Sequence, residues 1–288
     1  MLRFLRERAL PGVEEFAGGM YGRTLRLPHG AGTVALSDGG DHARFVLRLE
    51  DIRDLGSAVQ RCRRLLDLDA DPVAVAETLG ADPLLALLVE RSPGRRVPGS
   101  VDGAELAIRA AFGQQVSAAS ARTLAGRLVS LCGEPLPESL VEPDRALTHL
   151  FPKPGAVAEI GEANLAVPAA RREALRRLTR VLADGEVSLD PGSDREEAER
   201  RLLALRGIGP WTASYVAMRA LGDPDAFLPT DLGVKRAVRG LGSAGDPAGV
   251  AAMAERWRPW RAYATQHLWA SLSGSTVIQE PTKREVLA

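Results

Sequence analysis

At 288 residues, 45% of them hydrophobic, the chain is long enough for two domains with buried cores, and it has no run of about 18 apolar residues that would span a membrane. Its 37 basic and 37 acidic residues cancel, so the overall charge does not point to a nucleic-acid partner. The two cysteines, Cys62 and Cys132, lie on unrelated segments, which argues against a disulfide framework and predicts a cytoplasmic protein.

The first fifty residues predict a small antiparallel sheet. Three strands are expected, at residues 21–27, 33–37 and 44–49, where apolar and β-branched residues are frequent. Turn signals separate them at residues 28–30 (PHG) and 38–40 (DGG).

After Leu55 the pattern becomes helical. Leu124, Leu128 and Leu131 recur at helical spacing. Stretches rich in proline and glycine interrupt the pattern and predict a bundle of about eight to ten short helices. They fall at residues 93–94, 98–99, 133–137, 151–155 and 190–192. The fold class is therefore α+β, with an N-terminal antiparallel sheet followed by a mainly α-helical domain.

Residues 203–213 (LALRGIGPWTA) predict two helices joined by a tight hairpin. Gly207 and Gly209 allow backbone angles closed to other residues and a close approach to a partner. Backbone amides at the start of the second helix favour an anion, and a nucleic-acid phosphate fits that description. Residues 200–239 carry seven basic and three acidic side chains, which suits limited phosphate contact. The alternative is a tight turn between two packed helices.

A second informative segment, residues 226–236 (AFLPTDLGVKR), places Asp231 directly before a predicted helix. An aspartate in that position is a natural N-cap. The same position suits a reactive carboxylate, because the helix N-terminus keeps it ionised.

Together with residues 113–117 (GQQVS) and 258–264 (RPWRAYA), the latter followed by His267-Leu268-Trp269, these segments resemble the helix-hairpin-helix DNA glycosylases. The resemblance is closest to the DNA-3-methyladenine glycosylase II, or AlkA, type, and it covers nearly the whole chain. Four motifs in the same order make it specific.

The resemblance implies a sheet domain over residues 1–75, in which the family's first strand is expected to be incomplete or missing. It further implies a helix-hairpin-helix glycosylase domain over residues 76–278 and a flexible tail over residues 279–288. The implied activity is hydrolysis of the N-glycosidic bond of alkylated bases such as 3-methyladenine and 7-methylguanine. The enzyme would flip the base out of double-stranded DNA and so initiate base excision repair. The alternative is a non-catalytic helix-hairpin-helix DNA-binding module.

The resemblance also implies a nucleoid-associated monomer without a cofactor. Backbone carbonyls of the hairpin are a candidate site for a monovalent cation. No cluster of His, Cys and carboxylate residues has the spacing of metal ligands.

By this resemblance Asp231 is the catalytic residue, since a fixed anion stabilises the positive charge that develops on the sugar. Trp211 occupies the position at which strand-cutting relatives carry a Schiff-base lysine, which indicates a monofunctional enzyme. The iron–sulfur branch is excluded because no cysteine follows Cys132.

The resemblance assigns substrate binding to Trp211, Tyr215, Trp269 and Leu232. An indole face attracts a cationic alkylated base by about 0.5–2 kcal/mol. Tyr215 follows Trp211 by four residues and is expected on the same helix face.

DNA contacts are assigned to the hairpin and to one inserted side chain. Gln115 matches the position that fills the gap left by the flipped base, with Gln114 and Ser117 bracing the turn. The hairpin contacts are assigned to Gly207, Gly209, Thr212 and Ala213. His267 and the aromatic residues Trp257, Trp260 and Tyr263 are interpreted as structural.

Overall fold

A computed structural model describes residues 1–114, 117–161 and 167–273. The chain divides into two compact units. The first comprises Met1–Ala70 and Val97–Asp223, and the second comprises Asp71–Arg96 and Pro224–Ala288. The chain thus enters the second unit at Asp71, leaves it after Arg96 and returns to it at Pro224. The predicted domain boundary between residues 75 and 76 stays a prediction.

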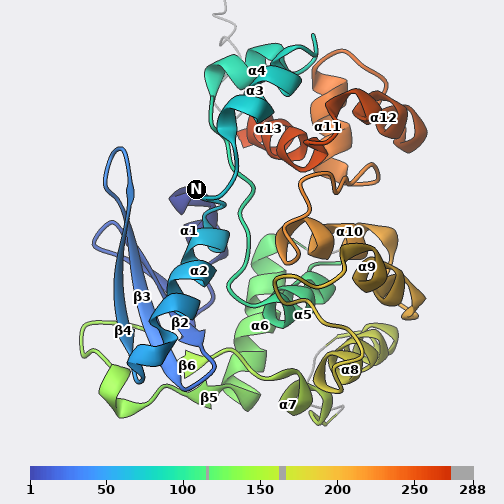
Figure 1. Cartoon of the computed structure of the whole chain (residues 1–288). Coiled ribbons are helices and arrows are strands. Elements are labelled where there is room, and N and C mark those ends of the chain that lie inside the picture. The colour runs from blue at the N-terminus through green and yellow to red at the C-terminus, as the bar shows by residue number, and fades with distance from the viewer. Residues whose placement is uncertain (115–116, 162–166, 274–288) are drawn as a thin grey trace, which may run out of the picture. The chain divides into compact units, whose positions relative to one another are not determined.

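The first unit begins with a helix and a four-stranded antiparallel sheet, which confirms the predicted fold class (Figure 1). The sheet order is β1-β2-β3-β4, and all its neighbouring strands are antiparallel. The elements are α1 (Leu2–Arg8), β1 (Glu14–Ala17), β2 (Met20–Arg26), β3 (Ala31–Asp38) and β4 (Ala43–Leu49). The three predicted strands correspond to β2, β3 and β4. The short strand β1 was not predicted, because Glu14 and Glu15 hide any apolar alternation.

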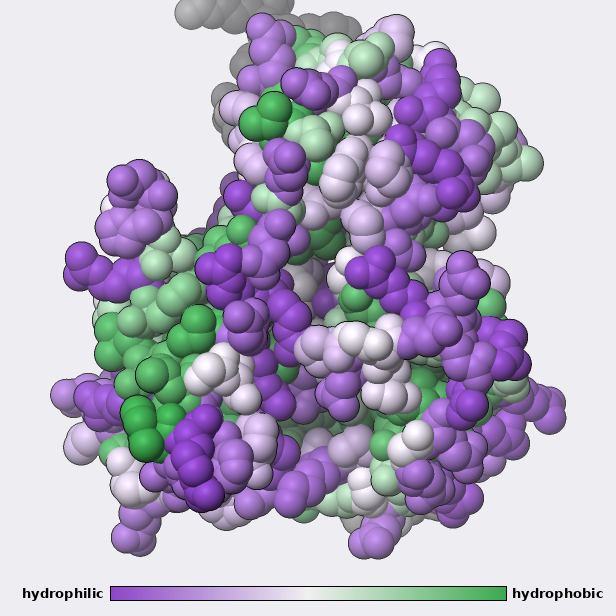
Figure 2. All heavy atoms as spheres, in the orientation of Figure 1, coloured by the Kyte–Doolittle hydropathy of each residue, from purple (hydrophilic) through white to green (hydrophobic). Residues whose placement is uncertain are grey.

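The sheet buries one apolar face against the helix α2 (Leu55–Leu65). Register pairs Tyr21 with Leu36 and Val34 with Leu47, so that large apolar side chains meet on that face. Figure 2 shows hydrophobic side chains over the edge strand β4, where Val46 is exposed. The central strands β2 and β3 are buried on both faces, whereas β4 alternates between half-buried and exposed residues.

Twelve α-helices, α2 to α13, lie in the described part of the chain from Leu55 onward, more than the eight to ten expected. Short helices without a full apolar period account for the difference. The remaining elements of the first unit are α5 (Gly103–Gly113), α6 (Ala118–Cys132), α7 (Pro154–Ala158), α8 (Ala169–Ala183), α9 (Arg195–Ala204) and α10 (Pro210–Arg219), with the short strands β5 (Glu134–Pro135) and β6 (His149–Leu150) and the 3₁₀ turns η1 (Ile52–Asp54) and η2 (Glu138–Leu140).

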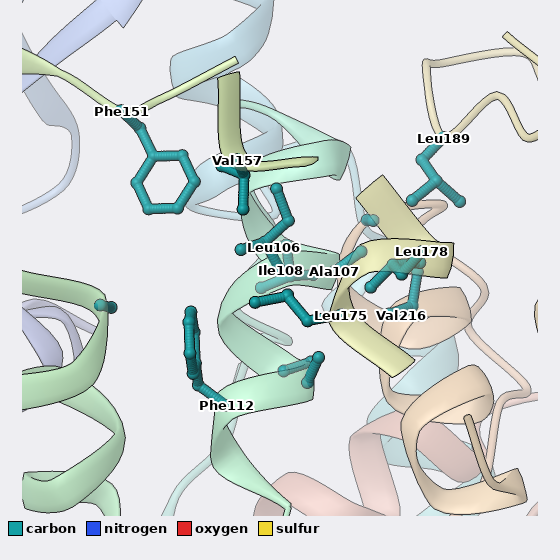
Figure 3. Packing of buried hydrophobic residues seen from close by; sticks show 14 of the residues in the cluster. Leu106, Ala107, Ile108, Phe112, Phe151, Val157, Leu175, Leu178, Leu189 and Val216 are labelled. Carbon is teal, nitrogen blue, oxygen red and sulfur yellow. The ribbon is translucent and has the colours of Figure 1, made fainter. Parts of the chain in front are cut away.

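The helical core of the first unit is built on α5. Its residues Leu106, Ile108 and Phe112 are buried, and the helix packs against α6, α8 and α10. Figure 3 shows Leu175 of α8 and Val216 of α10 among the side chains around it. Burying one such side chain contributes about 1.5–3 kcal/mol, so α5 is anchored on several sides.

The second unit is entirely helical among its described residues. Trp257 is fully buried and meets Phe227 edge to face, with ring centroids 5.7 Å apart, which confirms the packing interpretation of Trp257. The elements are α3 (Pro72–Gly80), α4 (Ala86–Arg91), α11 (Leu232–Gly240), α12 (Pro247–Ala254), the 3₁₀ turn η4 (Glu255–Trp257) and α13 (Arg261–Ser273). Within the described ranges, no helix has both the length and the apolar character needed to cross a bilayer.

Four charged side chains join the sheet to α5; three of them are buried, and that of Arg109 is 22% exposed. Arg23 of β2, only 4% exposed, lies 2.7 Å from Glu105 of α5 and 3.3 Å from Glu14 of β1. Arg109 lies 2.9 Å from Glu14 and 2.8 Å from Glu105, while the Tyr21 hydroxyl donates to Glu14 at 2.5 Å. Burial would raise the pKa of Glu105, but the guanidinium groups of Arg23 and Arg109 outweigh burial and lower it. We call these four residues the buried charge ring.

Replacing Arg23 by methionine should test the ring. Arg109 would be the only cation left beside Glu14 and Glu105, and breaking a buried pair typically costs about 3–5 kcal/mol. We expect the free energy of unfolding in urea to fall by that amount. The control is Arg48→Met on β4, whose side chain is 53% exposed and pairs with Glu142, for which at most about 1 kcal/mol is expected. Equal losses in both variants would contradict a special role for the ring.

Candidate functional site

The predicted hairpin lies between α9 and α10 (Figure 1). Its two glycines differ in backbone conformation. Gly207 has φ +97°, and a Cβ there would stand 2.5 Å from the Ala174 Cβ of α8, so only glycine fits. Gly209 has φ −96° and ψ 172°, which any residue adopts. The expected special backbone angle is therefore confirmed at Gly207 and wrong at Gly209. An added Cβ at Gly209 would point into open space, so that position leaves room for a partner.

The end of α5 braces the hairpin through Gln114. Its Nε2 donates to the Gly207 carbonyl at 3.2 Å and to the Thr212 hydroxyl at 2.8 Å. Ser117 caps α6, since its hydroxyl accepts from the Ser120 amide at 3.1 Å. Both residues therefore have the bracing role expected of them. Gln115, the predicted inserted side chain, lies outside the described residues, as does the tail over residues 279–288.

Two of the predicted DNA contacts are restricted by burial. The side chains of Thr212 and Ala213 are buried, so neither can reach a ligand directly. Their backbone amides donate to the Gly209 carbonyl at 3.0 and 3.1 Å. The backbone of Gly207 and Gly209 is thus the more accessible part of the hairpin.

Trp211 and Tyr215 form a stacked pair on α10. Their ring centroids are 5.0 Å apart and their planes differ by 11°. Both side chains are half-buried. The four-residue spacing thus places the two rings on one helix face, as predicted. Such a pair offers an electron-rich aromatic surface to a planar or cationic ligand.

Arg219 does not belong to the basic surface in which the sequence placed it. Its side chain is 8% exposed, and it donates to the carbonyls of Pro98 and Gly99 at 2.7 and 3.1 Å. The sequence pattern could not reveal this, because the acceptors lie more than a hundred residues earlier in the chain. The solvent-exposed charge near the hairpin is correspondingly smaller than expected.

Asp231 is the N-cap of α11 in the second unit, as the sequence predicted. Its Oδ1 accepts the Val234 amide at 2.9 Å and the Trp269 indole N–H at 2.8 Å. Trp269, expected only as an aromatic wall, is therefore also a hydrogen-bond donor to the carboxylate. The α11 backbone and the Trp269 side chain thus fix the same carboxylate oxygen from two directions. The arrangement maintains an oriented anion at the start of α11.

Gly233 makes room for this hydrogen bond. A Cβ there would stand 3.0 Å from Asp231 Oδ1 and 3.0 Å from Trp269 Cδ1. Sequence reasoning missed this glycine, although its position two residues after the aspartate could have drawn attention. Leu232, between Asp231 and Gly233 in the sequence, is 78% exposed. Its side chain can therefore contact a ligand.

His267 is buried on α13 and is neutral at physiological pH. Burial, reinforced by the positive charge of Arg95, lowers its pKa to about 4. A neutral, buried imidazole is unsuited to acid catalysis near pH 7. The structural interpretation of His267 is therefore supported.

The sequence-predicted residues thus form two local groups. Trp211 and Tyr215 stack in the first unit, beside the hairpin. Asp231, Leu232 and Trp269 lie together in the second unit.

The Trp269–Asp231 hydrogen bond can be tested by replacing Trp269 with phenylalanine. Hydrogen bonds to charged groups are worth about 1.5–3 kcal/mol, and we expect the free energy of unfolding in urea to fall by at least that much. Trp260→Phe, which removes the same volume from a half-buried ring packed on Tyr263, controls for lost packing. An equal loss in the two variants would argue against a contribution from the hydrogen bond.

Comparisons with known proteins identify the family and the fold. The AlkA N-terminal domain family matches residues 1–102. Over 279 residues the chain is 35% identical to DNA-3-methyladenine glycosylase 2 of Escherichia coli, a similarity covering 93% of this chain and 92% of that protein.

A longer relative occurs in Mycobacterium tuberculosis, under the name probable bifunctional transcriptional activator/DNA repair enzyme AlkA. It is 52% identical over 264 residues, which cover 92% of this chain and 52% of that protein. The chain thus spans about half the length of this relative.

The fold is also that of a solved structure, a 3-methyladenine DNA-glycosylase from Archaeoglobus fulgidus. The TM-score is 0.77 at 23% identity, with 95% of this chain and 93% of the other covered.

Proposed function

Because the chain belongs to the AlkA family of DNA-3-methyladenine glycosylases, we propose that it is a monofunctional DNA glycosylase. Its substrates are alkylated bases such as 3-methyladenine and 7-methylguanine in double-stranded DNA. It hydrolyses the N-glycosidic bond of a flipped nucleotide and so initiates base excision repair. The observation that carries the proposal is Asp231, a carboxylate oriented by both the α11 N-terminus and the Trp269 indole.

Asp231 supplies the electrostatics of bond cleavage. As the bond to the base breaks, positive charge builds on the sugar, and a preorganised anion stabilises that charge without reorganising. The carboxylate also orients or activates the attacking water. An alkylated purine with a cationic ring leaves as a neutral base, so the reaction needs no general acid.

Trp211 and Tyr215 bind the flipped base. Their parallel rings provide a stacking surface worth about 1–3 kcal/mol per base. A cationic base gains a further attraction of about 0.5–2 kcal/mol from the indole face. This gain is the physical basis for preferring alkylated over normal purines. In the second unit, the exposed Leu232 and the ring of Trp269 provide apolar surface for the substrate beside Asp231.

The hairpin binds the DNA backbone. Amides around Gly207 and Gly209, near the start of α10, face a phosphate through an open approach at Gly209. A monovalent cation on the hairpin carbonyls is compatible with this role, although the Gly207 carbonyl already accepts from Gln114. The protein acts as a nucleoid-associated monomer in the cytoplasm.

Replacing Asp231 by asparagine tests the catalytic role. We expect DNA binding to persist and release of 3-methyladenine to slow about a hundredfold to a thousandfold, as for one lost preorganised group. Release is measured by chromatography of bases freed from methylated DNA under single-turnover conditions. The matched control is Asp246→Asn, since Asp246 caps α12 in the same way, accepting the Gly249 amide at 2.8 Å. If both variants release 3-methyladenine at the wild-type rate, Asp231 is only a helix cap.

The end product tests the monofunctional assignment. With a tryptophan at position 211 instead of a lysine, no Schiff base can form there. We therefore expect the reaction to stop at an abasic site in an intact strand that breaks only after alkali treatment. Borohydride trapping of a protein–DNA adduct, with strand cleavage before alkali, would contradict this prediction.

A further inference from the structure

Arg219 lies at the end of α10, one turn after Tyr215, and is buried. Its Nε and Nη2 donate to the carbonyls of Pro98 and Gly99, and its Nη1 donates to the Tyr215 hydroxyl at 2.5 Å. The planar guanidinium fixes the directions of these three bonds relative to one another. Two backbone carbonyls thus determine where the third bond points.

The guanidinium of Arg219 also packs near an aromatic ring and a second guanidinium. The Cζ of Arg219 lies 4.9 Å from the centre of the Phe4 ring on α1, and the Cζ of Arg8 lies 3.9 Å from the same ring. Three segments distant in sequence therefore meet at Arg219: α1, residues 98–99 and α10. Burying an arginine is costly unless its donors are satisfied, and here hydrogen bonds to Pro98, Gly99 and Tyr215 satisfy three of them.

The bond to the hydroxyl constrains the ring that carries it. A phenol oxygen that accepts from Arg219 must direct its own proton elsewhere. The ring is then limited both by its helical rotamer and by the fixed hydroxyl. These constraints act on the same ring that lies 5.0 Å from Trp211 and within 11° of parallel to it.

We propose that Arg219 is a positioning residue: held by the Pro98 and Gly99 carbonyls, it fixes the Tyr215 hydroxyl and thereby keeps the Tyr215 ring parallel to Trp211. The base-binding consequence rests on the proposed glycosylase function. The positioning itself does not, because it concerns contacts within the protein. Arg219 touches neither the base nor the sugar in this proposal and acts only through Tyr215.

The charge at this contact provides an independent readout. Burial would raise the pKa of Tyr215, but the positive charge and hydrogen bond of Arg219, with Arg8 and Arg109 adding to them, lower it instead. Tyr21, by contrast, is buried beside Glu14, and its pKa is raised well above the usual value. Among the three tyrosines of the chain, Tyr215 should therefore ionise at lower pH than Tyr21.

A double-mutant cycle tests the positioning. Arg219→Met and Tyr215→Phe remove the same hydrogen bond from opposite ends, so each should slow single-turnover release of 3-methyladenine about tenfold, as for a weakened stacking surface. The double variant should be no slower than the slower single variant, because contacts in one network are not additive. Tyr263→Phe, which alters a packed tyrosine of the second unit, is the matched control and should keep the wild-type rate.

Multiplicative losses in the double variant would overturn the proposal, as would a Tyr215→Phe defect that Arg219→Met does not share. The latter result would mean that the hydroxyl contacts the substrate directly. Arg219→Met also leaves two buried carbonyls without this donor, so its folding must be checked by circular dichroism.

A second experiment, a pH titration of the tyrosines, needs neither DNA nor the Arg219 variant. An alkaline titration followed by ultraviolet absorbance should show one tyrosine of the wild-type protein ionising below the usual pH of about 10. That step should vanish in Tyr215→Phe. A wild-type titration without it would overturn the proposal even if Arg219→Met does not fold. If the step is present but no base is released from methylated DNA, the contact between Arg219 and the Tyr215 hydroxyl holds and the proposed function fails.

Discussion

The buried charge ring is the interaction on which the first unit depends. Arg23, Glu14, Glu105 and Arg109 alternate in sign at distances of 2.7 to 3.3 Å; the first three are buried, and the Arg109 side chain is 22% exposed. Removing such charges from water costs several kcal/mol per ion, and only close pairing on every side offsets that cost. The ring therefore tolerates one arrangement of the sheet on α5 and disfavours others. A purely apolar contact would allow more sliding between the two, because burial alone has no direction.

Because α5 is held at this ring, its far end becomes a fixed support for the hairpin. Gln114, directly after α5, bonds to the Gly207 carbonyl and the Thr212 hydroxyl, and Ala174 of α8 occupies the space that a Gly207 side chain would need. Trp211 and Tyr215 lie on α10, which ends at Arg219. Arg219 donates to the carbonyls of Pro98 and Gly99, which precede α5 in the chain. The aromatic pair is therefore constrained from both ends of its helix. Constraint from both ends reduces the ordering that a ligand would have to impose on the two rings.

In the second unit, the capping and catalytic interpretations of Asp231 are compatible. A cap must accept an amide at the start of a helix, and Asp231 accepts that of Val234. The same bond, together with that of Trp269, fixes the direction of the carboxylate. An anion that is already oriented is also what a developing sugar cation needs. Gly233 permits the arrangement by leaving space beside both partners.

The sequence by itself determined the features that depend on neighbours along the chain. Tyr215 lies on the same helix face as Trp211 because residues four apart in a helix are neighbours. Asp231 caps α11 because a capping side chain accepts the amide three residues later. Tertiary structure decided what depends on distant partners. Arg23 meets Glu105 across 82 positions, Trp269 meets Asp231 across 38, and Arg219 meets Pro98 across 121. No local pattern encodes such pairs, because the partner of a side chain at that separation depends on how whole helices and strands pack. That packing buries Arg219, which the sequence had placed on a basic surface.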